Sequence, residues 1–245
     1  MVIAQWKKID TKKVEVKHWL KVSDTTKELG KTTTGTISFA TENEIVKAYA
    51  KPEANGTFPG YVFDTEDPQN KKLEKEVKND SSSDTITLNL YYKPTVLTVS
   101  KKVTGYTLDA DKAFTFTIQA QAPLGTDPSA SIIQDGQIYI KKAGNIKNLA
   151  FANNEATFTL KHGESVDISC LPMGWTYTIE EADPKGNYKT TCQKTGGSVV
   201  DGRMLSFQME QESESVSFVN ASKVAPPVTG KTVQNNSFIL LLVLV

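Results

Sequence analysis

Apolar side chains recur at every second position in many segments of this 245-residue chain, and this alternation limits the folds open to it. Val14 and Val16 begin one such series near the start, and Phe114, Phe116 and Ile118 form another further along. A period of two is typical of a β-strand that buries one face and exposes the other. Such strands become stable when their apolar faces pack together in layers. We therefore predict a mainly β protein.

Residues 12–94 contain one departure from this strand pattern. Thr41 and Glu44 have the spacing of a capping box, and the apolar residues over 45–49 predict a short helix that ends before Pro52. Alternating strands lie on both sides of it. This order predicts a small α+β domain in which one helix packs across a sheet.

Three strings in this region are similar to the repeats of bacterial mucin-binding proteins: VEVKHWLK, GYVFD and ITLNLYYKP. The resemblance covers about 80 residues and implies a ubiquitin-like β-grasp module. It also implies that His18, which belongs to the first string, is a packing residue rather than a metal or catalytic ligand. Host glycans or mucin are the partners that the resemblance suggests.

Residues 95–222 show strands alone, at short and regular spacing, which is typical of an Ig-like β-sandwich. A Pro-rich segment begins after Ser222, where we expect the folded part to end. Residues 1–11 are a lead-in that we expect to continue an upstream domain, and 223–245 are a Pro-rich tail. The sequence thus looks truncated at both ends.

Three strands of the second region each place one polar residue in phase with apolar ones. These are Lys101 after Leu97 and Val99, Glu181 after Tyr177 and Ile179, and Asn220 after Val216 and Phe218. A lone polar group is costly inside an apolar core. Breaks in a local rule of this kind usually mark function.

Together these three side chains can react. In an apolar site, desolvation lowers the pKa of a lysine and raises that of a carboxylic acid, so a neutral amine and a protonated acid can coexist near neutral pH. We expect the Lys101 amine to attack the side-chain carbonyl of Asn220, while Glu181 stabilises the oxyanion and moves protons to the leaving ammonia. The product is an isopeptide bond, formed once in one chain. Because we expect no external substrate, we do not expect the protein to be an enzyme, and we expect no cofactor.

Five strings support the same assignment: LTVSKKVTG, FTFTI, TFTLKHGESVDI, LPMGWTYTIEE and VSFVN. In this order they resemble the pilin isopeptide-linkage domains of Gram-positive surface proteins, which are relatives of the Cna B-type fold. Carried over by position, the resemblance assigns the lysine to Lys101, the acid to Glu181 and the asparagine to Asn220. Lys102 and Glu180 are adjacent and titratable, but alternation puts both on the solvent face. An unreacted buried ion pair, or three surface residues at strand ends, are the alternatives.

The C-terminal tail resembles the LPxTG signal that sortases of Gram-positive bacteria cleave. Its string is Pro226, Pro227, Val228, Thr229 and Gly230, with a proline where the signal has leucine. A polar spacer follows, and then an apolar run over 238–245 that is shorter than the roughly 20 residues of a spanning helix. We expect an extracellular protein, anchored to the cell wall or built into a pilus, with sortase and either cell-wall peptide or pilin subunits as partners.

Charge and cysteine content argue against nucleic-acid binding and against a zinc site. Lys+Arg and Asp+Glu both total 28, so there is no basic field for nucleic acid. Cys170 and Cys192 are the only cysteines, too few for a disulfide scaffold and without the CxxC pairs of a zinc site. The sequence leaves open whether they form a disulfide or remain buried thiols.

The leading hypothesis is a structural or adhesive surface protein with a self-crosslinked stalk domain. The alternatives are a host-glycan or mucin adhesin, and the non-catalytic C-terminal part of a secreted enzyme.

Overall fold

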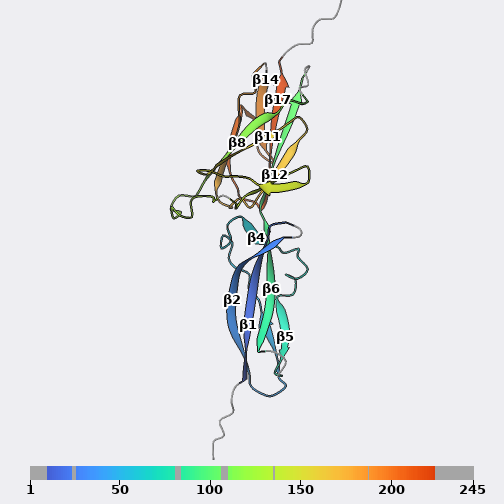
Figure 1. The fold of residues 1–245 in the computed structure, drawn as a ribbon, viewed down its shortest axis with the longest axis vertical. Helices are drawn as coiled ribbons and strands as arrows, with labels where there is room; N and C mark the ends of the chain where they lie inside the picture. Colours follow the sequence, from blue (N-terminus) through green and yellow to red (C-terminus); the bar gives the residue numbers. More distant parts are fainter. Residues whose placement is uncertain are drawn as a thin grey trace, which may run out of the picture.

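All the secondary structure in the described part of the chain is β. The computed structural model describes residues 10–23, 26–80, 84–105, 110–134, 136–186 and 188–223, and these contain no helix. A membrane-spanning helix is accordingly absent from the same residues. The strands form two bodies stacked end to end (Figure 1), with β1 beginning at one end of the molecule and β17 ending at the other.

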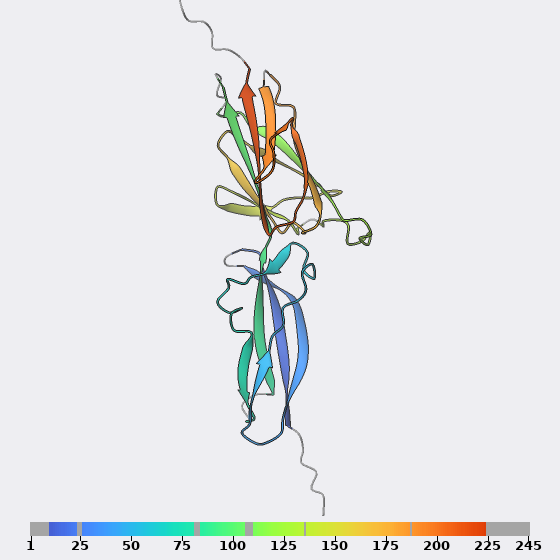
Figure 2. The same cartoon turned by 180° about the vertical axis from the view of Figure 1, so that it is seen from behind.

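The N-terminal body is a small sandwich of two unequal sheets. A four-stranded sheet has the order β2-β1-β6-β4, and a two-stranded sheet pairs β3 with β5. Both contribute to one core, because Ala48 on β3 and Val77 on β5 are buried with Val14, Val16 and Leu88. Figure 2 shows β3 and β5 lying over the larger sheet. The strands are β1 (Asp10–Lys21), β2 (Lys27–Phe39), β3 (Ile45–Tyr49), β4 (Tyr61–Phe63), β5 (Glu74–Lys78) and β6 (Thr85–Pro94).

The helix predicted over 45–49 is wrong, because those residues form β3, paired antiparallel with β5. The capping-type bonds nevertheless exist: the Glu44 carboxylate accepts the backbone N–H groups of Ala40 (2.5 Å) and Thr41 (3.0 Å). They close the turn that leads into β3. With a second sheet in place of a helix, the α+β β-grasp prediction for this body is also wrong.

The C-terminal body is the predicted β-sandwich. Its larger sheet has seven strands in the order β10-β9-β12-β7-β17-β14-β15, and the facing sheet has four, β11-β8-β13-β16. Inward residues of both sheets form one core that includes Val99, Phe116, Ile179 and Phe218. The strands are β7 (Val96–Thr104), β8 (Phe114–Gln121), β9 (Tyr139–Lys142), β10 (Asn145–Asn148), β11 (Glu155–Leu160), β12 (Ser165–Ser169), β13 (Thr176–Glu181), β14 (Tyr188–Lys194), β15 (Val200–Asp201), β16 (Met204–Gln208) and β17 (Ser213–Ser222).

The two bodies repeat one arrangement of strands. In each, the first strand pairs in parallel with the last, β1 with β6 and β7 with β17. An antiparallel neighbour flanks each side, so β2-β1-β6-β4 corresponds to β12-β7-β17-β14. The two bodies therefore share these four strands, although β2 follows β1 directly in the chain whereas β8 to β11 lie between β7 and β12.

The junction between the bodies is short and closely packed. Thr95 is the one residue between β6 and β7. It is fully buried; its N–H donates to the Gly60 carbonyl (2.9 Å) and its hydroxyl donates to the Leu171 carbonyl (2.6 Å). Gly60 has φ +79°, and a Cβ on it would lie 2.1 Å from the Cys170 oxygen, so only glycine allows this approach.

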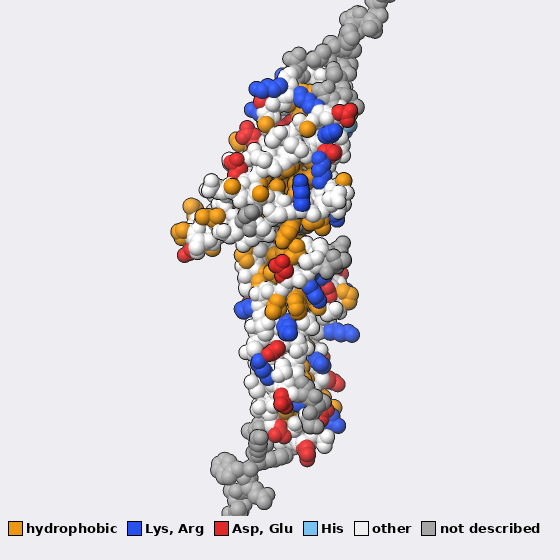
Figure 3. Space-filling view, viewed as in Figure 1, with side chains coloured by type: hydrophobic (Ala, Val, Ile, Leu, Met, Phe, Trp, Pro, Cys, Tyr) orange, Lys and Arg blue, Asp and Glu red, His pale blue; other side chains and the backbone are white. Residues whose placement is uncertain are grey.

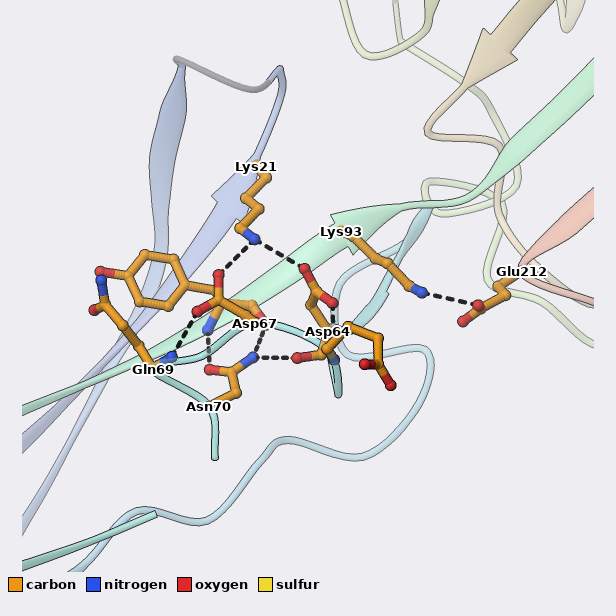
Figure 4. A network of polar contacts seen from close by, with 9 residues as sticks. Lys21, Asp64, Asp67, Gln69, Asn70, Lys93 and Glu212 are labelled. Atoms are coloured by element: carbon orange, nitrogen blue, oxygen red, sulfur yellow. Dashed lines mark hydrogen bonds and ion pairs between the residues drawn. The ribbon is translucent and has the colours of Figure 1, made fainter. Parts of the chain in front are cut away.

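Side chains close the outside of the junction. The Lys93 ammonium pairs with the Glu212 carboxylate (2.8 Å) across it, and next to this pair Lys21 binds Asp64 and Asp67 (Figure 4). Figure 3 shows hydrophobic side chains gathered where the bodies meet. Those lining a groove there include Phe58, Pro59, Met173 and Trp175.

Candidate functional site

The sandwich brings the three predicted residues together in the C-terminal core. Lys101 lies on β7 and Asn220 on the adjacent parallel strand β17, while Glu181 reaches them from β13 in the facing sheet. Phe218 is the residue opposite Lys101, so Asn220 is one inward position further along. The exposed fractions are 1% for Lys101 and 0% for both Glu181 and Asn220.

Glu181 contacts both partners with its two oxygens. Its Oε2 lies 2.7 Å from the Lys101 Nζ, and its Oε1 accepts a hydrogen bond from the Asn220 Nδ2 at 2.5 Å. The Oδ1 of Asn220 is the one buried side-chain polar atom without a hydrogen-bond partner in the described part of the chain. The structure therefore places the acid at the nitrogen of the amide, whereas the sequence-based mechanism also expected it at the oxygen.

The surroundings favour an uncharged amine. Burial lowers the pKa of Lys101, outweighing the hydrogen bond and attraction of Glu181. Phe116 and Phe218 pack edge to face in the same core (5.2 Å), whereas the Phe114 ring, with its centroid 4.5 Å from the Nζ, acts in the opposite sense and favours the cation. For Lys21 at the junction, burial acts in the same sense, but the bonds to Asp64 and Asp67 outweigh it and raise the pKa.

Alternation predicted correctly which of these residues face the core. Lys102 and Glu180, the adjacent titratable residues, are both exposed, whereas Lys101 and Glu181 face the core. The alternative of three surface residues at strand ends is therefore wrong for this set.

A family model described as "Domain of unknown function (DUF7601)" matches residues 95–222, the segment that carries this site. The chain belongs to the DUF7601 family. Two curated relatives come from Streptococcus pyogenes. A pilus tip adhesin, Cpa, is 34% identical over 141 residues, which is 56% of this chain and 18% of that protein. A pilin of serotype M1 is 33% identical over 102 residues, which is 40% of this chain and 28% of that protein.

The DUF7601 segment is thus a Gram-positive pilin-like domain, and the chain spans less than a third of the length of these relatives. Among solved structures, a mutant of the major pilin from Streptococcus pyogenes matches 86% of this chain and 98% of its own, at 19% identity and a TM-score of 0.50. This likeness concerns the fold alone.

Two contacts in the DUF7601 domain are beyond what the sequence indicates. The Arg203 guanidinium donates to the Glu181 backbone carbonyl (3.0 Å), and the Glu181 N–H donates to the Arg203 carbonyl (2.8 Å). Together they fix the end of β13 at the site. Arg203 is the only arginine of the chain, but its contact to a backbone atom leaves no trace in a residue pattern. The sequence pattern predicts Phe114 as an inward residue of β8, but it does not predict the contact of its ring with the Lys101 amine.

The structure describes Cys170 and Cys192 as free, buried thiols, and the disulfide that the sequence left open is not formed. The Cys170 N–H donates to the Thr95 carbonyl, at the start of β7. Cys192 lies opposite Phe218 on β17, and Phe218 lies opposite Lys101, about six residues along β7 from Thr95. These residues span roughly 20 Å at about 3.3 Å per residue. The two cysteines are therefore much further apart than the roughly 7 Å between Cα atoms that a disulfide allows. Burial raises the pKa of both thiols.

The predicted sortase signal, Pro226 to Gly230, and the apolar run after it lie outside the described residues. A cluster of side chains able to hold a metal ion is absent from the residues that the structure does describe.

Proposed function

We propose that the chain is part of a cell-surface pilus protein, structural or adhesive, whose DUF7601 domain is closed by a self-formed isopeptide bond between Lys101 and Asn220. The observation that supports this most is the buried bridge Lys101–Glu181–Asn220 with the amide oxygen left unpartnered. A native core rarely leaves such an atom unsatisfied unless the site has a chemical role. The pilin and pilus adhesin relatives supply the surface location.

The bond forms by amide exchange. The pair starts as a neutral Lys101 amine and a protonated Glu181, and the Nζ attacks the Asn220 Cγ to form the new C–N bond. Glu181 then gives its proton to the Nδ2 and takes one hydrogen from the Nζ, while the Cγ–Nδ2 bond breaks and ammonia leaves. One amine hydrogen of Lys101 thus replaces the proton that Glu181 gives to the ammonia, and Glu181 is returned unchanged.

The intact mass of the purified chain tests this proposal. We expect a mass one ammonia below the calculated value, and tandem mass spectrometry should recover a branched peptide that joins the Lys101 and Asn220 segments. Lys101→Met removes the amine from the core and should restore the full mass, whereas Lys102→Met on the solvent face should leave the loss unchanged. Alkylation of both thiols after denaturation excludes a disulfide as the source of the shift. A full mass for the folded wild-type chain contradicts the proposal.

We further propose that a sortase cleaves between Thr229 and Gly230 and transfers the Thr229 carboxyl to an amine of cell-wall peptide or of a pilin. This rests on the PPVTG string, which follows the last described strand, β17, in the sequence. Residues 223–245, completed with a full spanning segment and fused to a secreted reporter, should move the reporter to the wall fraction only when sortase is present. If Thr229→Ala does not alter the fractionation, the tail is a plain anchor.

We do not propose host glycans or mucin as ligands of this chain. The resemblance that suggested them implied a β-grasp module, and the described N-terminal residues form a β-sandwich instead.

A further inference from the structure

The repeated strand arrangement gives each body an equivalent pair of positions on its first and last strands. In the C-terminal body, Lys101 lies opposite Phe218, and Asn220 is the next inward residue of the last strand. In the N-terminal body, His18 lies opposite Leu90, and Tyr92 is the next inward residue. His18 and Tyr92 therefore occupy the places of Lys101 and Asn220.

The pair at these positions is buried, as the C-terminal pair is, but it is joined by a direct hydrogen bond, whereas Lys101 and Asn220 are joined through Glu181. His18 is 0% exposed and Tyr92 2%. The His18 Nδ1 lies 2.9 Å from the Tyr92 hydroxyl, and the same hydroxyl accepts the Glu53 N–H (2.9 Å). Because the hydroxyl oxygen already accepts from the backbone, its own hydrogen is available for the Nδ1. The arrangement suits a neutral imidazole that accepts from Tyr92.

Besides Tyr92 on β6, the charged and titratable groups around His18 come from β2 and from the loop after β3. The Glu53 carboxylate, in the loop after β3, lies 3.8 Å from the Nε2, and Lys31 on β2 binds that carboxylate at 3.0 Å. The Thr33 hydroxyl on β2 is 3.4 Å from the Nε2, and the Phe58 ring covers the imidazole with centroids 5.9 Å apart.

We propose that His18 and Tyr92 are the noncovalent counterpart of the Lys101–Asn220 pair, and that protonation of His18 opens the N-terminal body while the C-terminal body stays closed. A proton on the Nδ1 turns it from acceptor to donor, so the hydrogen bond from Tyr92 is lost and the hydroxyl hydrogen needs a new acceptor. The Lys31 ammonium offsets much of the stabilisation that Glu53 could offer to an imidazolium.

The sign of the pH effect follows from these contacts. Burial lowers the pKa of His18 below its ordinary value, and this outweighs the attraction of Glu53. The folded state therefore stays neutral at pH values where the unfolded chain, with a pKa of about 6.5, binds a proton. Stability from this residue is present above pH ~6.5 and is lost as the pH falls. The unfolding constant of the N-terminal body should rise by up to about tenfold per pH unit.

Hydrogen exchange of the whole chain at pH 7.5, 6.5 and 5.5, corrected for intrinsic exchange, tests the proposal. Peptides from β1 and β6 should lose protection by up to about tenfold between pH 6.5 and 5.5, while those from β8 and β13 should not. His18→Asn keeps an acceptor for Tyr92 but cannot titrate, so its β1 and β6 protection should not fall over this range. His162→Asn, in the other body, should behave as wild type. Unchanged wild-type protection, or an equal loss in His18→Asn, overturns the proposal.

A second measurement needs no variant at His18. The chain has two histidines, and an NMR titration assigned with His162→Asn gives the protonation of His18 in the folded state. We expect protonation below pH 6.5, and protonation at or above that value overturns the proposal. The inference uses strand registers and the contacts of His18, and no step of isopeptide formation, so it holds or fails independently of that reaction.

Discussion

Glu181 bridges two side chains that would each be costly to bury alone. Without it, the Lys101 amine would be buried with no acid to share its proton, and removing one partner of a buried pair typically costs about 3–5 kcal/mol. The Arg203 contacts hold the end of β13, and with it the carboxylate, between the lysine and the amide. The position of one acid thus affects the stability of the core and, in the reaction proposed here, the transfer of protons.

Glu181→Ala should fold with reduced stability and retain the full calculated mass, because no group remains to move protons between Lys101 and Asn220. The matched change, Glu180→Ala, removes a carboxylate on the solvent face and should lose one ammonia as wild type does. Intact-mass measurement of the two variants side by side decides this. Ammonia loss from both would mean that Glu181 has no part in the reaction.

Strand periodicity made these three residues predictable from sequence. Successive strand residues face opposite sides of a sheet, so the choice of Lys101 over Lys102, and of Glu181 over Glu180, depends only on neighbouring apolar residues. The Phe114 and Arg203 contacts were beyond prediction because alternation indicates which face of a strand a residue lies on, but not which side chain or backbone atom it contacts. His18 was predicted only to pack, since its Tyr92 partner is set by the parallel register of β1 and β6.

At the scale of elements, β3 shows how a correct local signal can give a wrong structure. The Thr41–Glu44 signature was real, yet the same bonds that cap a helix can close a turn between strands. What decided the outcome was the larger sheet, whose buried face needed a cover that β3 and β5 supply together. Such tertiary demands override local propensity. The sandwich over 95–222 was predictable because each of its strands is marked locally.

The crosslink would close a loop of about 120 residues between β7 and β17. In the chain-entropy account of disulfides, a closure of this length contributes on the order of 4–5 kcal/mol. Lys101→Met should therefore lower the melting temperature of the C-terminal body markedly, while Lys102→Met should not. Calorimetry of the two variants tests this, and equal melting temperatures for wild type and Lys101→Met would contradict it.

Gly60 determines how closely β4 approaches the loop after β12. Gly60→Ala combines an unfavourable φ, worth about 1–2 kcal/mol, with a collision against the Cys170 carbonyl. Gly56→Ala has a similar φ, +90°, but open space around the added carbon, so it is the matched control. We expect Gly60→Ala to be the more destabilising of the two in thermal unfolding. Equal effects would show that the close approach is unimportant.

At the scale of the whole molecule, tension along the chain enters the C-terminal body at the start of β7 and leaves it at the end of β17. These two strands are parallel neighbours, so tension shears them past one another. A bond from Lys101 to Asn220 would transmit the tension directly from β7 to β17, so the residues between these two positions would not be extended. In the N-terminal body, only hydrogen bonds and packing join the corresponding strands.

Single-molecule pulling of the wild-type chain should therefore show one major lengthening, from the N-terminal body of about 80 residues, at roughly 3.3–3.6 Å per residue. Lys101→Met should add a second, longer event as the C-terminal body extends. Two full lengthening events in the wild type would rule out a covalent closure of β7 to β17.

The single residue that connects β6 to β7 also determines where such a molecule can bend. Thr95 is bound to both bodies through its N–H and its hydroxyl, and the backbone of Gly60 packs directly against that of Cys170. These contacts oppose bending at the junction, so we expect the two bodies to behave as one stiff segment. In a filament joined from many such chains, compliance would be confined to the seams between chains, and the spacing of those seams would set how tightly the filament can curve.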